Sequence, residues 1–184
     1  MLCRSEALRL LEEHVKSKNL LKHMYAVETV MRALARHFKE DEELWGLAGL
    51  LHDIDYDSTK DDFPQHGLVG GKILEEAGLP AELVYAVKSH NWYHGLPRKS
   101  LLDKALYATD PLTGLIVAGA LIRPEKKLDA VDLAFLINRF HEKSFARGAN
   151  RELIASCSEM GLTLEEFISI GLKAMQDIHN ELGL

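Results

Sequence analysis

The feature that most constrains the fold is the spacing of apolar residues, which recur at three- and four-residue intervals along almost the whole chain. Met24, Val27, Met31, Leu34 and Phe38 show this spacing most clearly, and it places an apolar stripe along one side of a helix. No run alternates apolar and polar residues between turn signals, as a half-buried strand would. We therefore predict an all-α fold, built as a single-domain helical bundle.

Capping residues and breakers predict where individual helices begin and end. Asp41 precedes a helix that runs toward His52, since an Asp side chain accepts hydrogen bonds from the first free backbone N–H groups of a helix. Residues 55–64 are polar and lack periodicity, so they are predicted to form a loop. A later helix is predicted to end near Asp110, because Pro111 has no N–H and clashes with the preceding helical turn.

Composition limits the class of protein. The 184 residues are 47% hydrophobic and 27% charged, which is ordinary for one globular domain. The net charge of -6 argues against general nucleic-acid binding, which depends on basic surface. The apolar stretch 112–122 is too short to span a bilayer, the N-terminus lacks a signal-peptide pattern, and Cys3 and Cys157 form no spaced motif. We expect a cytoplasmic protein with no membrane association.

Several polar residues that can bind metals lie on the apolar side of a predicted helix, near its end or directly after it. The pair His52-Asp53 comes directly after an apolar run, and buried polar groups must find partners or cost roughly 1–3 kcal/mol each. A shared transition-metal ion would satisfy several of them at once, because imidazole nitrogens and carboxylate oxygens are its common ligands. The candidate ligands, in chain order, are His23, His52, Asp53, His66, His90 and Asp110.

Each of these residues, taken singly, could have a structural role instead of binding a metal. A lone histidine at an apolar edge more often hydrogen-bonds to backbone than binds a metal, and the chain contains nine histidines. Asp110 before Pro111 could simply end a helix. The ordered series of six is harder to explain in this way than any member of it.

This series resembles the HD-domain superfamily of metal-dependent phosphohydrolases, in which a His, a His-Asp pair and a distal Asp lie on a helical core. The segment 106–111, Leu-Tyr-Ala-Thr-Asp-Pro, further resembles a small group of predicted HD hydrolases without an assigned substrate. The resemblance implies one HD-type domain over residues 1–184, with a ligand-bearing core of about 19–122 and C-terminal helices of about 123–184 packed on it. It implies a first metal on His23, His52, Asp53 and Asp110, and a second on His66 and His90 with Asp53 bridging.

The resemblance implies one or two divalent transition-metal ions as cofactors. The mixture of imidazole and carboxylate suits Mn, Fe, Co, Ni or Zn. Where one large subgroup has His-Asp-Ile-Gly, this chain has Asp55 in the glycine position, which weakens an assignment to the cyclic-dinucleotide branch. Asp55 and Asp57 are candidates for proton transfer or for support of the ligands, and both could be plain loop carboxylates. Lys60 is a candidate phosphate contact, with a solvated loop lysine as the alternative.

A phosphate-binding cation is expected near the metals if the protein is a hydrolase. Arg147 is favoured, because it lies in a glycine-containing connection with Lys143 and Arg151 close in sequence, and a guanidinium matches phosphate geometry. Trp92 and Tyr93 follow His90 and could wall a pocket, stack on a base, or belong to the core. The remaining cationic candidates are Lys60, Arg98 and Arg123.

Three functions are consistent with this pattern. The first is a phosphohydrolase that acts on a nucleotide or another small phosphorylated metabolite, with Asp53 orienting a metal-bound water that attacks phosphorus. The second is a di-iron oxygenase, since some proteins of the same superfamily use this ligand set with dioxygen. The third is a non-catalytic helical module that binds a nucleotide or a protein partner around a structural metal. The sequence leaves the oligomeric state open.

Overall fold

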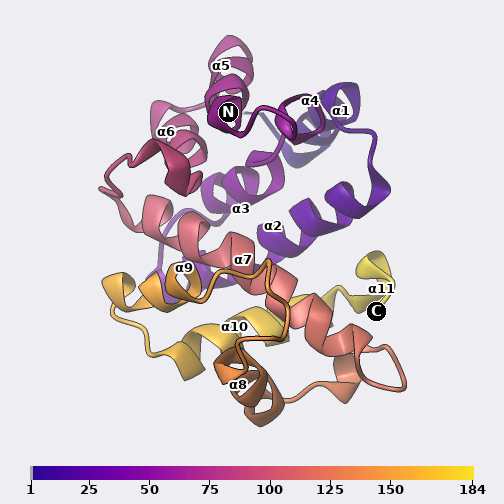
Figure 1. Ribbon diagram of the computed structural model, residues 1–184. Helices are drawn as coiled ribbons and strands as arrows, with labels where there is room; N and C mark the ends of the chain where they lie inside the picture. Colours follow the sequence, from indigo (N-terminus) through magenta and orange to yellow (C-terminus); the bar gives the residue numbers. More distant parts are fainter. Residues whose placement is uncertain (1) are drawn as a thin grey trace.

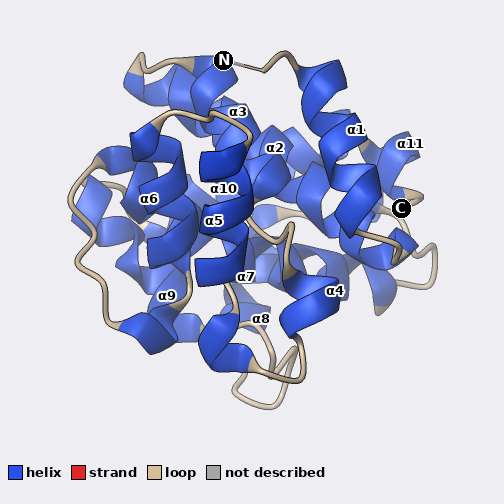
Figure 2. Cartoon of the chain, turned by 90° about the horizontal axis from the view of Figure 1, so that it is seen from above, coloured by secondary structure: helices blue, strands red, loops and turns tan. Residues whose placement is uncertain are grey.

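The computed structural model describes residues 2–184, so Met1, the first residue of the expected domain, lies outside the described residues. Within that range the chain is helical and contains no strand, which confirms the predicted all-α class (Figures 1 and 2). Short 3-10 turns, labelled η, connect several of the helices. The α-helices are α1 (Arg4–His14), α2 (Lys18–Phe38), α3 (Glu42–Leu51), α4 (Tyr56–Thr59), α5 (Leu68–Glu76), α6 (Ala81–His90), α7 (Leu101–Leu121), α8 (Leu133–His141), α9 (Arg151–Ala155), α10 (Leu164–Asp177) and α11 (His179–Leu182). The 3-10 turns are η1 (Phe63–Gln65), η2 (Trp92–His94), η3 (Leu128–Ala130) and η4 (Ser156–Met160).

Helix α7 crosses the middle of the molecule (Figure 1). On one side it packs against α2 and α6, and on the other against α8, α9 and α10. Its buried residues include Leu112, Leu115 and Ile116 on one stretch of the helix. The same helix thus joins the first half of the chain to the C-terminal helices.

The predicted helix end near Asp110 is wrong, because α7 continues through Pro111 to Leu121. Pro111 removes one backbone hydrogen bond, but the turns on both sides of it are packed. Thr109 and Leu112, which flank the Asp110-Pro111 pair, are fully buried. Tertiary packing of these flanking turns therefore outweighs the local preference of proline to end a helix.

Helices α2 and α3 form an antiparallel pair that brings His23 next to His52. Lys39 leaves α2 in the left-handed conformation (φ 60°), and the Asp41 side chain caps α3 by accepting from the backbone N–H groups of Glu43 and Leu44, as predicted. At Gly49 the helices come so close that a Cβ would lie 2.9 Å from the Glu28 Cα. This close approach sets the distance between the two histidines.

The segment predicted as a loop, residues 55–64, contains the short helix α4 and the start of the turn η1. The next helix, α5, begins at Leu68, after Gly67 (φ 83°). A polar segment can fold into a short helix without any apolar period when side-chain hydrogen bonds hold its backbone. Here the hydroxyls of Ser58 and Thr59 donate to the Asp55 carbonyl, at 2.8 and 2.9 Å.

The C-terminal helices return to the first half of the chain. Helix α10 packs on α2 and α7, and a Cβ on its Gly171 would lie 2.8 Å from a methyl carbon of Leu112. None of the helices within residues 2–184 combines the length and apolar character needed to traverse a lipid bilayer.

In the connection of residues 142–150, here called the lip, one side chain makes several hydrogen bonds to the backbone. The Arg151 guanidinium donates hydrogen bonds to five backbone carbonyls, at 2.6–3.3 Å. Three of these carbonyls belong to the lip, at Phe145, Ala146 and Ala149, and two to the end of α8. The sequence grouped Arg151 with Arg147 and Lys143 as a cation near a possible phosphate. In the structure its guanidinium is instead occupied by backbone carbonyls and does not offer a free charge to a ligand.

Candidate metal centre

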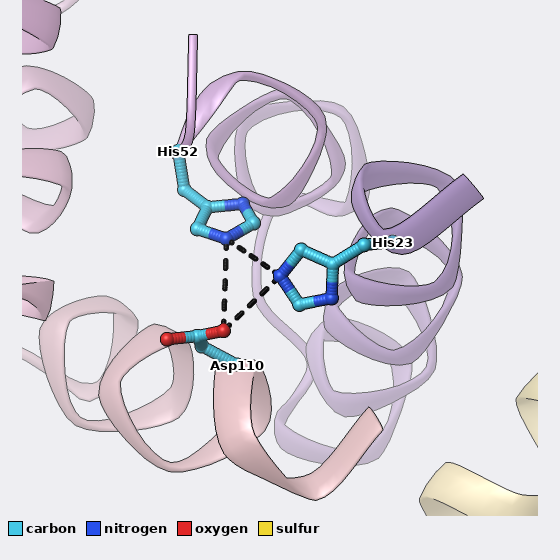
Figure 3. Close-up of side chains that lie close together, drawn as sticks. All are labelled: His23, His52 and Asp110. Carbon is cyan, nitrogen blue, oxygen red and sulfur yellow. Dashed lines mark hydrogen bonds and ion pairs between the residues drawn. The ribbon is translucent and has the colours of Figure 1, made fainter. Parts of the chain in front are cut away.

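Three helices deliver the first group of side chains. His23 comes from α2, His52 follows the last turn of α3, and Asp110 lies in α7 (Figure 3). The His23 Nε2 lies 3.2 Å from the His52 Nε2 and 3.1 Å from the Asp110 Oδ1. His52 is fully buried, and Asp110 and His23 are partly exposed.

Asp53 lies between this group and a second pair of histidines. Its Oδ1 is 3.3 Å from the His52 Nε2, 3.3 Å from the His66 Nε2 and 3.4 Å from the His90 Nε2. Its Oδ2 is 3.7 Å from the His23 Nε2. The His66 and His90 Nε2 atoms are themselves 3.1 Å apart. One carboxylate therefore contacts all four imidazoles, and the structure brings together all six residues that the sequence singled out as ligands.

Each imidazole has a hydrogen-bond partner on its Nδ1, the ring nitrogen that faces away from the other candidate ligands. His52 donates to the Gly49 carbonyl at 2.8 Å, and His90 donates to the Val87 carbonyl at 2.5 Å. His66 donates to the Asp55 Oδ1 at 2.9 Å, and the His23 Nδ1 lies 3.2 Å from the Thr113 hydroxyl. Such a partner on one ring nitrogen fixes the tautomer and leaves the other nitrogen to bind a metal.

The donor spacing fits metal ions. Ligand atoms that surround one ion at about 2.0–2.2 Å lie about 3.0–3.5 Å from one another in tetrahedral or octahedral arrangements, and the Nε2 and oxygen atoms here are mostly 3.1–3.4 Å apart. Among residues 2–184, two groups of three offer ligand atoms close enough to share one ion, the first formed by His23, His52 and Asp110 and the second by His52, Asp53 and His90. In the first group the His52 Nε2 and the Asp110 Oδ1 are the most widely separated, at 3.9 Å.

The charges of the site are arranged around the two carboxylates. Burial lowers the pKa of His52 to about 4, so this imidazole is neutral. Burial also lowers the pKa of His66, but hydrogen bonds to Asp53 and Asp55 outweigh it and raise that pKa to about 10. Burial raises the pKa of Asp53, yet the hydrogen bonds of His66 and His90 and the charge of His23 hold it well below its usual range. In the absence of a metal ion, the proton on His66 thus provides the positive charge that a bound cation would provide beside these carboxylates.

Asp55 is a support for His66 and does not reach the group around His23. Besides His66 it accepts hydrogen bonds from the backbone N–H groups of Gly67 at 2.8 Å and Gly70 at 2.7 Å. A Cβ at Gly70 would lie 3.2–3.3 Å from the Asp55 carboxylate, so the glycine permits the close approach. The aspartate that replaces the subgroup's glycine therefore fixes the orientation of one histidine.

Five of the six residues line an open cavity of about 420 Å³, here called the site cavity, and the fully buried His52 lies behind them. Its walls include Leu20 of α2, Phe63 of η1 and Trp92 of η2. Gly148 and Asn150 of the lip complete it on the side of the C-terminal helices.

The cationic candidates lie at different distances from this cavity. Arg147 is exposed in the lip, directly before Gly148, which lines the cavity. Arg98 pairs with Glu159 at 2.6 Å and stacks on the Tyr107 ring at 4.0 Å. Arg123 lies near the end of α7, against the Phe135 ring at 5.0 Å. Lys60 is exposed at the end of α4. Of the described residues that line the site cavity, none is one of these four cations.

Two supporting residues were missed by sequence reasoning. Thr113 lies one turn after Asp110, donates to its carbonyl at 2.9 Å and contacts His23, but the predicted helix end at Pro111 hid this spacing. Asn91 donates to the His66 carbonyl at 2.9 Å and to the Phe63 carbonyl at 3.2 Å. Its place directly after His90 was the only signal in the sequence.

Comparison with known proteins agrees with this arrangement. The HD domain family matches residues 20–158. A ribonuclease Y from Desulfotalea psychrophila is 32% identical over an alignment of 144 residues, and the match covers 74% of this chain and 26% of the relative. An uncharacterized protein from Methanocaldococcus jannaschii is 34% identical over 79 residues, or 40% of this chain and 46% of the relative. The chain thus spans about a quarter of the length of the ribonuclease and less than half that of the archaeal protein.

No solved structure matches the chain. The family match nevertheless covers more than half of the chain and includes all six converging residues. The chain therefore belongs to the HD domain family.

Proposed function

We propose that the protein is a metal-dependent phosphohydrolase that acts on a phosphate ester, either a nucleotide or another small phosphorylated metabolite. The observation that carries this proposal is the convergence of four Nε2 atoms and two carboxylates at the base of an open cavity. A purely structural metal site is usually closed by four ligands, whereas this one has six candidate ligands and opens to solvent.

Each residue has a role in this proposal. His23, His52, Asp53 and Asp110 would hold one divalent ion, and His66 and His90, together with Asp53, would hold a second. When bound, such ions would supply an activated water at neutral pH and stabilise charge on the phosphoryl group. Asp53 fixes the two ligand groups relative to each other, and Asp55 and Thr113 keep two of the imidazoles in the orientation and tautomer that ligation needs.

Because several relatives are named ribonuclease Y, a phosphodiester in RNA is added to the substrates proposed for this protein. The net charge of -6 predicts no general nucleic-acid binding, so an RNA substrate would be bound through its end or through a few nucleotides and not along an extended basic groove. Mn, Fe, Co, Ni and Zn all suit the donor set of imidazole and carboxylate.

Metal analysis followed by a hydrolysis screen tests the proposal. Protein purified without chelator is analysed for metals, then loaded with each candidate ion and assayed against nucleotides, sugar phosphates and short RNAs. We expect hydrolysis that continues without oxygen and is lost in Asp53→Asn, while Asp61→Asn, an exposed residue of the nearby segment, keeps it. Activity that requires dioxygen would instead identify the oxygenase chemistry of the same superfamily.

A further inference from the structure

Three aromatic side chains, two exposed and one half-buried, form a cluster at the edge of the site cavity, here called the aromatic rim. They are Phe63 of η1 and Trp92 and Tyr93 of η2. The Phe63 ring centre lies 5.7 Å from that of Trp92 and 6.1 Å from that of Tyr93. Trp92 and Tyr93 are each 54% exposed, although large aromatic side chains are usually mostly buried. Burial as plain core, the structural alternative for these two residues, is therefore wrong.

The aromatic rim is continuous with the metal centre. Phe63 and Trp92 line the same cavity as His66 and His90, and the Phe63 ring centre lies 5.9 Å from that of His66. The cavity thus presents candidate metal ligands at its base and aromatic faces at its edge. A ligand that fills it has to offer a group for each.

Asn91 fixes the rim in position relative to the metal centre. Its Oδ1 accepts from the Tyr93 backbone N–H at 3.0 Å, while its Nδ2 donates to the carbonyls of Phe63 and His66. The same side chain thus ties both aromatic segments to a candidate ligand. Asn91 is 2% exposed, so these bonds are shielded from competing water.

The charge beside the rim indicates which part of a substrate it contacts. Asp61 and Asp62, next to Phe63, are exposed, and their carboxylates would repel a phosphate that passed over the rings. A nucleobase is uncharged and has an aromatic face, so it stacks on indole and phenol rings without that penalty. We propose that the aromatic rim binds the nucleobase of a substrate whose phosphate lies at the metal centre.

This assignment rests on the proposed phosphohydrolase function and narrows it. The required chemistry is a base joined through ribose to a phosphate, and sugar phosphates without a base do not satisfy it. Both a free mononucleotide and the terminal nucleotide of single-stranded RNA contain this unit.

Tryptophan fluorescence can report base stacking without any turnover. The chain has two tryptophans, and Trp45 is 2% exposed while Trp92 is 54% exposed. Metal-loaded protein is titrated with each of the four ribonucleoside 5′-monophosphates and with ribose 5-phosphate, and the emission is read directly after mixing. We expect saturable quenching by at least one nucleotide and none by ribose 5-phosphate.

Variants separate stacking from other effects. Trp92→Ala is expected to bind the nucleotide about 5- to 150-fold more weakly, the range measured for removing an aromatic side chain from a stacked base. Trp92→Phe keeps an aromatic face, so it should retain most of the affinity measured by calorimetry and lose the fluorescence change. Ile122→Ala removes an equally exposed apolar side chain, 52% exposed near the end of α7, and should bind as the parent protein does.

The outcomes distinguish this proposal from the hydrolase proposal. If the four nucleotides bind Trp92→Ala as tightly as the parent protein, or ribose 5-phosphate binds as tightly as they do, the base site is overturned even if hydrolysis is observed. If quenching and the loss in Trp92→Ala occur without hydrolysis of any ester, the base site stands and the hydrolase proposal falls. A short oligoadenylate that binds more tightly than adenosine 5′-monophosphate would identify an RNA end as the source of the base, and equal affinity would identify the mononucleotide.

Discussion

At the scale of single residues, the geometry of the site depends on the side chains that hydrogen-bond to the candidate ligands as much as on the ligands themselves. Asp55 accepts three hydrogen bonds, from His66, Gly67 and Gly70, in a position that is 1% exposed. A carboxylate can accept all three at once, whereas an amide has one oxygen acceptor and one NH2 donor.

Asp55→Asn is therefore expected to weaken the His66 side of the metal centre. One donor would face the new NH2 group, at a cost of roughly 1–3 kcal/mol in the free energy of unfolding. Metal content after gel filtration should fall, with the ion held by His66 and His90 lost first. Urea unfolding of the metal-free protein measures the first effect and elemental analysis the second. Full metal content with unchanged stability would remove Asp55 from its supporting role.

Metal affinity is expected to rise with pH between about 6 and 9. The pKa of His66 is raised to about 10, so this residue keeps its proton below that pH, and an ion must displace it to bind. His52, with a pKa lowered to about 4, is already neutral and adds nothing to the slope in this range. One released proton corresponds to about a tenfold gain in affinity per pH unit, measured by competition with a chelator. A flat profile would contradict the assignment of His66 as a ligand.

The candidate ligands could be predicted from the sequence because several of them lie on the apolar side of a helix or directly after it, where a polar group needs a partner, and because their order resembles that of the HD-domain superfamily. Thr113 and Asn91 could not be predicted in this way. A Thr in an apolar helix and an Asn after a helix are common, and their roles depend on neighbours that are 90 and 25 residues away in the chain.

At the scale of helices, the distance between α2 and α3 controls the geometry of His23 and His52. The backbones come closest at Gly49, where a Cβ would lie 2.9 Å from backbone atoms of Glu28 and Val27. Backbone cannot move aside as the end of a flexible side chain can, so the whole helix would have to shift.

Gly49→Ala is expected to lower the free energy of unfolding by about 1–3 kcal/mol, the usual cost of overpacking, and to reduce metal content by separating the two histidines. Gly114→Ala in α7 is the matched control, because nothing lies within 4 Å of its added Cβ. That control should gain roughly 0.5–1 kcal/mol through helix propensity. Equal effects of the two substitutions on urea midpoints would show that the close approach at Gly49 is unimportant.

Helix α7 shows where local rules are insufficient. The helix before Asp110 was predicted correctly, and Pro111 wrongly ended it there. The local cost of a proline is about 3 kcal/mol, which buried turns on either side can outweigh, but that burial becomes visible only when the C-terminal helices are in place. The short helix α4 was missed for the opposite reason, since four polar residues carry no apolar period.

At the scale of the whole molecule, the C-terminal helices contribute to the site cavity through the lip. Gly148 and Asn150 line the cavity, more than 30 residues beyond Asp110, the last candidate ligand. Arg147 is exposed next to them, so its use as the substrate's phosphate contact stays a prediction with a direct test.

Arg147→Ala is expected to raise KM about 10-fold or more, because a hydrogen bond to a charged group contributes about 1.5–3 kcal/mol, while kcat changes less if the contact is equal in ground and transition states. Lys143→Ala removes the same charge from the same exposed segment and controls for general electrostatic attraction. Unchanged kcat/KM in Arg147→Ala, or an equal loss in both variants, would exclude a specific phosphate contact.

The single guanidinium of Arg151 has a consequence for how the lip moves in time. Five carbonyl bonds that share one donor side chain break together when that side chain leaves. The lip can then open locally at a free energy below that of the core, with the Arg139–Glu142 ion pair and the buried Ala149 as further restraints. The hydrogen-bonded amides of Phe145 and Ala149 would then exchange with solvent at a common rate, the rate at which the lip opens beside the site cavity.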